Sequence, residues 1–335
     1  MSISYGFGIA GGAIAASGAS LTFDDTAFIG NSALIGGALF VSEDSVGIFY
    51  NETSFVENNA TSSGGALYVS KNCSLYWSGK STFIGNNASV YGGALYTYEN
   101  SAVSFDANVS FSNNIAGNSG GAMHVAGNAS VAMNGVANFD ANKADTTGGG
   151  ISVIDVGSSV YWSQAASFTG NQAYRGGVLY IHNGGRLSYT GPTKFVLNSA
   201  TKSGGVLGSG AFSAISNYEE SLFFVRGPTS FENNTAGGNG GGIALLGMLN
   251  VEFEATEVTF YGNTADVAGG AIFISGTGVA PILSDMTFTS NSAKVGGAVY
   301  AVASGVELTE GNANPTTFAR CSFVGNKAVT TGGAV

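Results

Sequence analysis

The acidic side chains and the two histidines are the groups in this sequence that could perform acid–base chemistry. Cleavage of a polysaccharide would need several of them gathered at one place, with a carboxylate close to a cation or a second acid. Glu252 and Glu254 instead alternate with apolar residues, as on the solvent-facing side of a strand. His124 and His182 do not form a pair, because they lie two coils apart at different repeat positions. We expect both histidines at the surface. We therefore predict that the chain is not an enzyme, and a polysaccharide lyase or hydrolase is the less favoured alternative.

Cofactor and metal motifs are equally sparse. The segment Gly6–Gly11, "GFGIAG", has the glycine spacing of a dinucleotide-binding loop, but the residues after it do not resemble the helix which that loop requires. Cys73 and Cys321 are the only cysteines, so the chain has neither a disulfide framework nor a cysteine metal site. We expect both to be buried free thiols, and we expect no cofactor.

The net charge limits which classes of partner the chain can bind. A net charge of -10 with only 11 Lys and Arg residues argues against nucleic acid and anionic membranes. No apolar run reaches the roughly 18 residues of a membrane-spanning segment, so we expect no direct membrane span in this chain. Seven sequons would permit N-glycosylation if the protein is secreted. They lie at Asn51, Asn59, Asn72, Asn87, Asn108, Asn128 and Asn233.

The elements that would position any site come from a repeat. Eleven copies align on a phenylalanine, with an Asn three residues later, an Ala five residues later and a Gly-Gly pair eight or nine residues later. Most copies are 27 to 29 residues apart, and two are longer. The phenylalanines are Phe28, Phe55, Phe83, Phe111, Phe139, Phe168, Phe195, Phe231, Phe260, Phe288 and Phe323. A repeat of this kind predicts one stacked architecture.

The repeat predicts strands and no helix. After each Gly-Gly pair, aliphatic residues recur at every second position, which indicates a strand with one buried face. Two further strand-like stretches lie in each copy, and Gly-Gly with β-branched residues disfavours a helix. We predict an all-β, single-stranded, right-handed parallel β-helix of about 11 coils with three short strands each. It would form one continuous unit over residues 1–335, as a segment of a longer chain, with longer loops near 208–221 and 303–316.

Stacking of the coils assigns structural roles to the fixed residues. Each Phe would lie on the Phe of the next coil, and each inward Asn would bond backbone groups and its neighbours above and below. This structural ladder includes Phe28, Phe55, Phe83, Phe111, Phe139, Asn31, Asn58, Asn86, Asn114 and Asn142. The ladder explains the repeat by architecture alone.

The variable positions are the candidates for binding. Phe40, Tyr68, Tyr96 and His124 share one outward repeat position, so their rings would stack about 4.8 Å apart. Such a column either stabilises the sheet or offers a flat aromatic strip to sugars or to another rod. We find no acid at the same repeat position as a cation in an adjacent coil, so we expect no charged pair of catalytic type.

The FxxN residues, together with GGA followed by Ile, Leu or Val, resemble the repeats of chlamydial polymorphic outer membrane proteins. Similar repeats occur in surface proteins of algae and other protists. The resemblance includes copies such as "FENNTAGGNGGGI" and covers nearly the whole chain. It implies an extracellular or cell-surface β-helix, often the passenger of an autotransporter adhesin. It also implies partners such as other copies of the chain, surface proteins or glycans.

Overall fold

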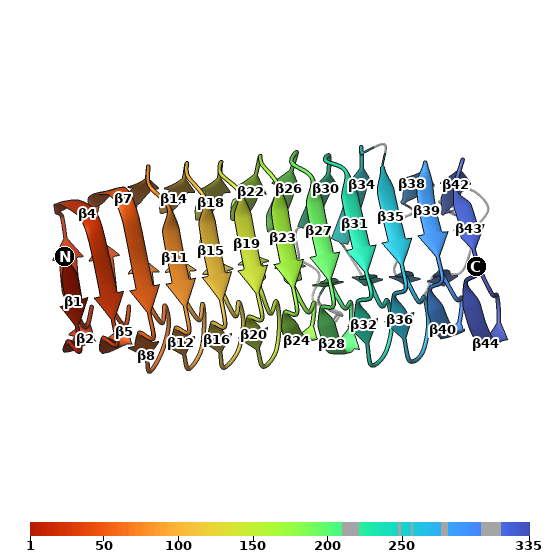
Figure 1. Cartoon of the computed structure of the whole chain (residues 1–335), viewed down its shortest axis with the longest axis horizontal. Helices are drawn as coiled ribbons and strands as arrows, with labels where there is room; N and C mark the ends of the chain where they lie inside the picture. The colour runs from red at the N-terminus through yellow and green to blue at the C-terminus, as the bar shows by residue number, and fades with distance from the viewer. Residues whose placement is uncertain (210–220, 247–248, 256, 276–280, 303–315) are drawn as a thin grey trace.

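The chain is a stack of short parallel strands that extends in one direction (Figure 1). This computed structural model describes residues 1–209, 221–246, 249–255, 257–275, 281–302 and 316–335. These residues form strands, turns and bends, and no helix occurs among them. The prediction of an all-β parallel β-helix is confirmed. The two longer loops predicted near 208–221 and 303–316 fall on residues 210–220 and 303–315, almost wholly outside the described part of the chain.

Sheet A forms the face that carries the phenylalanines. Its 19 strands all pair in parallel, each with the equivalent strand of the next coil. They are β1 (Ser2–Ser4), β4 (Ser20–Ile29), β7 (Val46–Val56), β10 (Ser74–Trp77), β11 (Ser81–Ile84), β14 (Ala102–Phe105), β15 (Val109–Ser112), β18 (Ser130–Met133), β19 (Ala137–Asp140), β22 (Ser159–Trp162), β23 (Ala166–Thr169), β26 (Arg186–Tyr189), β27 (Thr193–Val196), β30 (Ser221–Val225), β31 (Thr229–Glu232), β34 (Leu249–Phe253), β35 (Val258–Tyr261), β39 (Met286–Thr289) and β43 (Ser322–Val324).

Sheet B follows the Asn turn and has 12 strands, several of them only two residues long. They are β2 (Phe7–Ala10), β5 (Ser32–Ile35), β8 (Asn59–Ala60), β12 (Asn87–Ala88), β16 (Ile115–Ala116), β20 (Lys143–Ala144), β24 (Gln172–Arg175), β28 (Ser199–Ser203), β32 (Thr235–Ala236), β36 (Thr264–Ala265), β40 (Ser292–Val295) and β44 (Lys327–Thr331).

Sheet C follows the Gly-Gly pair and has 11 strands. They are β3 (Ile14–Ser17), β6 (Leu39–Ser42), β9 (Leu67–Val69), β13 (Leu95–Thr97), β17 (Met123–Val125), β21 (Ile151–Ile154), β25 (Leu179–His182), β29 (Leu207–Ser209), β33 (Ile243–Leu246), β37 (Ile272–Ser275) and β41 (Val299–Val302). Two further strands, β38 (Ile282–Ser284) and β42 (Thr317–Ala319), pair with each other.

The three strands predicted for each coil are present, but two of them lie in the same sheet. Most coils give sheet A two strands separated by a short turn, such as β10 and β11, so these coils hold four strands. In the first coils the two strands merge into the single long strands β4 and β7. The strand in sheet B is the element that the sequence prediction missed, because in several coils it has only two residues, too few to show a period.

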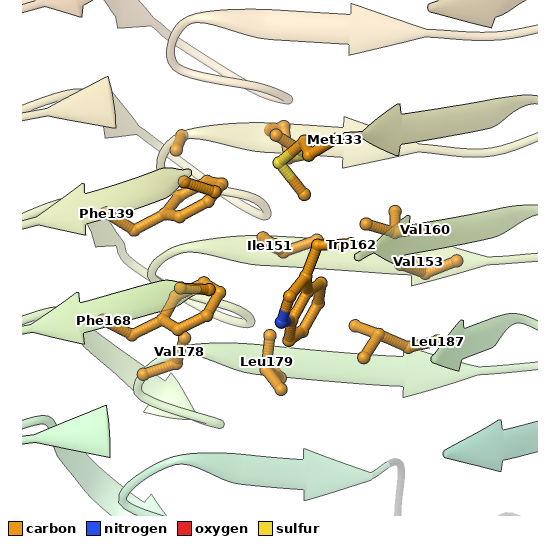
Figure 2. Close-up of a cluster of buried hydrophobic side chains, with 14 of the residues drawn as sticks. Met133, Phe139, Ile151, Val153, Val160, Trp162, Phe168, Val178, Leu179 and Leu187 are labelled. Carbon is orange, nitrogen blue, oxygen red and sulfur yellow. The ribbon is translucent and has the colours of Figure 1, made fainter. Parts of the chain in front are cut away.

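The interior is organised as columns of identical side chains. The eleven repeat phenylalanines stack from Phe28 to Phe323 with ring centroids 4.5 to 5.1 Å apart. Figure 2 shows Phe139 above Phe168, with Trp162 beside them and aliphatic residues such as Leu179 on the facing sheet. Full burial of one such side chain contributes about 2 kcal/mol, so the column is a main source of stability.

A second column consists of buried asparagines at the turn between sheets A and B. In Asn86, the backbone N–H and the Nδ2 both donate to the Oδ1 of Asn114 at 3.0 Å, and Nδ2 also donates to the carbonyl of Phe55. The same side-chain bond links each pair of successive coils from Asn31 to Asn326. An amide suits this position because it donates and accepts at once.

The Gly-Gly pair is required by close backbone contacts. Gly92 has a φ of 61°, in the left-handed region that glycine tolerates. A Cβ on Gly93 would lie 2.1 Å from the carbonyl oxygen of Gly121 in the next coil. Each residue of the pair is therefore fixed for its own reason, the first by conformation and the second by space.

Candidate binding surface

Sheet C carries the predicted aromatic column on its outer face. Strands β6, β9, β13 and β17 place Phe40, Tyr68, Tyr96 and His124 in direct register. Ring centroids are 5.5 Å apart for Phe40 and Tyr68, 5.0 Å for Tyr68 and Tyr96, and 5.4 Å for Tyr96 and His124. Four successive coils thus present one continuous row of rings, which ends where Ser152 occupies the position in the next coil.

Two tyrosines that the sequence analysis missed widen this row. Tyr91, which directly precedes a Gly-Gly pair, stacks on His124 at 4.7 Å and on Tyr96 at 6.0 Å. Tyr98 stacks on Tyr96 at 5.8 Å. The spacing of two residues between Tyr96 and Tyr98 was a usable signal. Nothing in the sequence pointed to Tyr91, because a turn brings it over the strand. We call Phe40, Tyr68, Tyr91, Tyr96, Tyr98 and His124 the aromatic cluster.

The prediction that His124 lies at the surface is wrong. Its side chain points away from the rod interior, but only 2% of the residue is exposed, because the rings of Tyr91 and Tyr96 cover it. Burial lowers the pKa of His124 to about 3, so the imidazole is neutral. Its Nδ1 has no hydrogen-bond partner among the described residues. His182 is half-buried, and burial lowers its pKa as well.

The other rings of the column are half-buried rather than fully exposed. Burial is the main cause that raises the pKa of Tyr68, and the nearby Glu99 carboxylate adds to it. Burial also raises the pKa of Tyr96, followed by neighbouring tyrosines. Both hydroxyls therefore stay protonated at neutral pH. The cluster offers neutral rings with hydroxyl edges, which suits stacking and hydrogen bonding to sugars or to another protein. It offers no group poised for acid–base catalysis.

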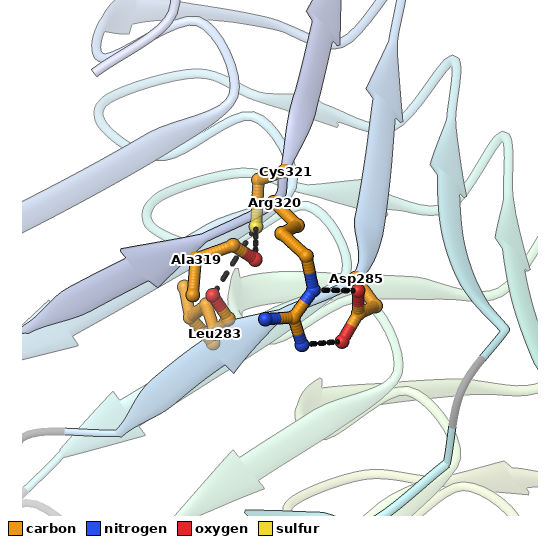
Figure 3. Close-up of polar contacts among 5 residues, drawn as sticks. All are labelled: Leu283, Asp285, Ala319, Arg320 and Cys321. Atoms are coloured by element: carbon orange, nitrogen blue, oxygen red, sulfur yellow. Dashed lines mark hydrogen bonds and ion pairs between the residues drawn. The ribbon is translucent and has the colours of Figure 1, made fainter.

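Cations and acids of adjacent coils do pair, contrary to our expectation. Arg226 binds Glu254 through two hydrogen bonds of 3.0 and 3.1 Å, and Arg320 binds Asp285 in the same bidentate way (Figure 3). Lys71 pairs with Glu43 and Lys80 with Glu52. The sequence comparison missed these pairs because the repeat was aligned on its fixed residues, whereas the pairs lie at variable turn positions. They are exposed and mutually neutralised, so each joins its two coils only weakly.

The remaining chemical motifs do not assemble into a site. The Gly6–Gly11 segment contains β2, and β3 follows it, so it opens no helix. Within the described ranges, no three His, Cys, Asp or Glu residues are grouped in a way that could hold a metal ion. Cys73 and Cys321 are both free; Cys73 is buried as expected, but Cys321 is only partly buried. The described residues contain no helix that is long and apolar enough to cross a membrane.

The sequons differ in accessibility. Asn51, Asn72, Asn108, Asn128 and Asn233 are exposed. Asn59 and Asn87 are half-buried in sheet B, and the Nδ2 of Asn87, the atom a glycan would modify, donates to Asn59 at 2.8 Å. Glycosylation remains a prediction, and the exposed positions are the better acceptors.

A comparison with protein-family models gives a match to the Chlamydia polymorphic membrane protein repeat. It covers residues 52–70, 80–98, 228–245, 257–275 and 285–302. Each segment begins three residues before a repeat phenylalanine and ends in or just after a strand of sheet C. The match of these five segments to that repeat confirms the resemblance seen in the sequence. Neither a curated protein nor a solved structure matched the chain.

Proposed function

We propose that this chain is the rod of an extracellular, cell-surface protein that acts as a non-enzymatic adhesive and structural module. The observation that carries the proposal is the aromatic cluster. It gathers six rings on the outer face of sheet C, whereas the fixed residues of the repeat are directed into the rod. An autotransporter-type adhesin passenger is the alternative form of this function that the resemblance implies.

The division of labour within each coil supports this function. The fixed residues of the repeat contact the neighbouring coils and are not available to a partner. They are the Phe column, the Asn column and the Gly-Gly pairs. A partner must therefore be met by the outward, variable positions. Among these, half-buried rings such as Tyr68 and Tyr96 are already ordered by stacking, so binding would cost them little conformational entropy.

The test is binding of the purified rod to cells and to immobilised neutral glycans, with Tyr68→Thr and Tyr96→Thr combined in one variant. We expect at least about tenfold weaker binding, since stacking contacts of about 1 kcal/mol each are lost from two rings. Threonine is chosen because it keeps the strand propensity.

A control variant combines Tyr50→Thr and Tyr76→Thr. These tyrosines are 44% and 40% exposed on sheet A and do not belong to the cluster. We expect the control variant to bind like the unmodified rod. Equal losses in both double variants would contradict a role for the cluster. A rod that only self-associates and binds no surface would favour a filament component instead.

A further inference from the structure

The charges of the chain are segregated along the rod. Residues 1–70 contain six acids and no Lys or Arg, whereas residues 156–218 contain four cations and no Asp or Glu. The four cations are Arg175, Arg186, Lys194 and Lys202. In a chain of net charge -10, this segment is a positive band of about two coils between acidic neighbours, which we call the basic band.

All four cations of the basic band lack acidic partners among the described residues. None of the four forms an ion pair with an acid in the part of the chain that the structure describes. Of the seven Lys and Arg residues elsewhere, five are in ion pairs. Unpaired positive charge is therefore concentrated where an external anion could use it.

Within the band, three side chains of sheet B come together. Tyr174 is 41% exposed in β24, with the guanidinium carbon of Arg175 5.6 Å and the Nζ of Lys202 5.5 Å from its ring centroid. The register between β24 and β28 shifts after Ala173, so that two residues of β28, one of them Lys202, lie opposite Tyr174. Such a bulge redirects side chains, and here it brings the ammonium to the ring.

This trio can recognise a particular ligand chemistry. A guanidinium binds carboxylate or sulfate through paired hydrogen bonds, and an ammonium adds a second charge from the next coil. Arg175 as a whole is half-buried, and its buried Nε has no hydrogen-bond partner among the described residues, so no protein acceptor holds the guanidinium at that atom. The exposed edge of the Tyr174 ring provides an apolar contact for a sugar.

We propose that the basic band binds an anionic polysaccharide, with Arg175 and Lys202 holding its carboxylate or sulfate groups and Tyr174 positioning both cations. Lys194 and Arg186, exposed on sheet A, extend the positive potential around the coil. Because acidic coils flank the band, the polymer crosses the rod along a coil rather than following its long axis. The charges alone would suit a polysaccharide or a nucleic acid. The choice of a polysaccharide rests on the proposed surface function.

A second copy of the chain fits the band less well. Among the acids of residues 1–70, Asp24 and Asp25 lie in β4 and Glu52 lies in β7, whereas Glu43 and Asp44 lie at a bend. Four of the six acids are already engaged. Glu43 and Glu52 pair with lysines, Asp24 accepts a bond from Asn51, and Asp25 accepts one from the backbone of Glu52. They form no single acidic patch that matches the band, whereas a flexible polyanion needs no preformed complementary surface.

The experiment measures binding of the purified rod to polygalacturonate and to dextran sulfate, with neutral dextran and a single-stranded oligonucleotide as comparison probes. We expect both anionic polysaccharides to bind, neutral dextran not to bind, and affinity to fall as salt rises from 50 to 200 mM, in the manner of polyanion binding in general. A variant with Arg175→Gln and Lys202→Gln should bind about tenfold more weakly.

The matched control is a variant with Lys294→Gln and Lys327→Gln. These lysines are exposed on β40 and β44 of the same sheet and form no ion pair with a described acid, so the charge change is identical. We expect less than about a twofold effect. The proposal would be overturned if both double variants lost affinity equally, or if the oligonucleotide bound more tightly than the polysaccharides. It would also be overturned if the Arg175 and Lys202 variant lost self-association of the rod but kept polymer binding. The Tyr68 and Tyr96 variant should keep full polyanion binding, so failure of the proposed adhesion would be distinguishable.

Discussion

Two tryptophans occupy equivalent places inside the rod and differ in one hydrogen bond. Trp162 stacks on Tyr189 at 4.6 Å, and its Nε1 donates to the hydroxyl of Thr193 in the next coil at 2.9 Å. Trp77 stacks on Phe49 at 4.0 Å, but its Nε1 is buried without a partner among the described residues. In the coil after Trp77, Val109 occupies the position that Thr193 occupies in the coil after Trp162.

The comparison shows what this architecture demands of each coil. Stacking columns accept Phe, Trp, Tyr or Met with little change, since any large apolar side chain fills the space. A buried polar group is different, because its partner must be supplied by the neighbouring coil. Each Asn of the column finds its hydrogen-bond partner in the neighbouring coil. The Nε1 of Trp77 and the Nδ1 of His124 have no partner among the described residues. Paired and unpaired groups should therefore respond differently to mutation and to pH.

Removal of a fully paired group should have the largest effect. Asn114→Ala removes the acceptor of the Asn86 backbone N–H and Nδ2, and it removes the donor to Phe83 and Asn142. We expect a loss of about 4 kcal/mol in unfolding free energy, because buried groups are left unsatisfied on both sides. The urea unfolding midpoint measures this loss.

Asn138→Ser is the control for that change. Asn138 is exposed on the neighbouring strand, and serine occupies its register partner Ser167. We expect a change below about 0.5 kcal/mol. If Asn114→Ala also proved nearly neutral, the Asn column would not be a source of stability.

The unpaired His124 should make stability depend on pH. Its folded pKa of about 3 lies below the value of about 6.5 expected in the unfolded chain, so only the unfolded state takes up a proton between these values. The contribution of neutral His124 to the free energy of unfolding is therefore fully present above pH 6.5, and it is lost as the pH falls toward 3. Between pH 7 and pH 5 we expect a loss of about 2 kcal/mol from this residue.

Urea midpoints at pH 7 and pH 5 test this expectation against a His124→Ser variant. Serine occupies the equivalent position at Ser152, where it is fully buried. The variant should lose most of the difference between the two pH values, whatever its stability at pH 7. An unchanged difference would mean that His124 is readily protonated in the folded state.

The smallest effect should come from repairing the tryptophan that lacks a partner. Val109→Thr places a hydroxyl where Thr193 stands for Trp162, and we expect a gain of about 1 kcal/mol in unfolding free energy. The reciprocal change, Thr193→Val, should cost about as much or slightly more, because Trp162 then loses its acceptor. Thermal unfolding of both variants tests the pair, and losses of similar size in both would contradict the comparison.

The fold could be predicted from the sequence because its signals are local and repeated. FxxN, Gly-Gly and the period of two placed the coil boundaries and the strands of sheets A and C, but not the short strands of sheet B. The aromatic row was also predictable, since Tyr68 and Tyr96 share a repeat position. Tyr91 and the Tyr174, Arg175 and Lys202 trio were not, because a turn and a change of register bring these side chains together.

The sequence by itself determined the stacking: eleven copies of one pattern require each residue type to meet itself in the next coil. Only the tertiary structure decided which outward positions are accessible. His124 and Tyr96 occupy the same repeat position, yet Tyr91 covers one far more than the other. Exposure depends on neighbours from other coils and turns, and a period along the chain carries no information about them.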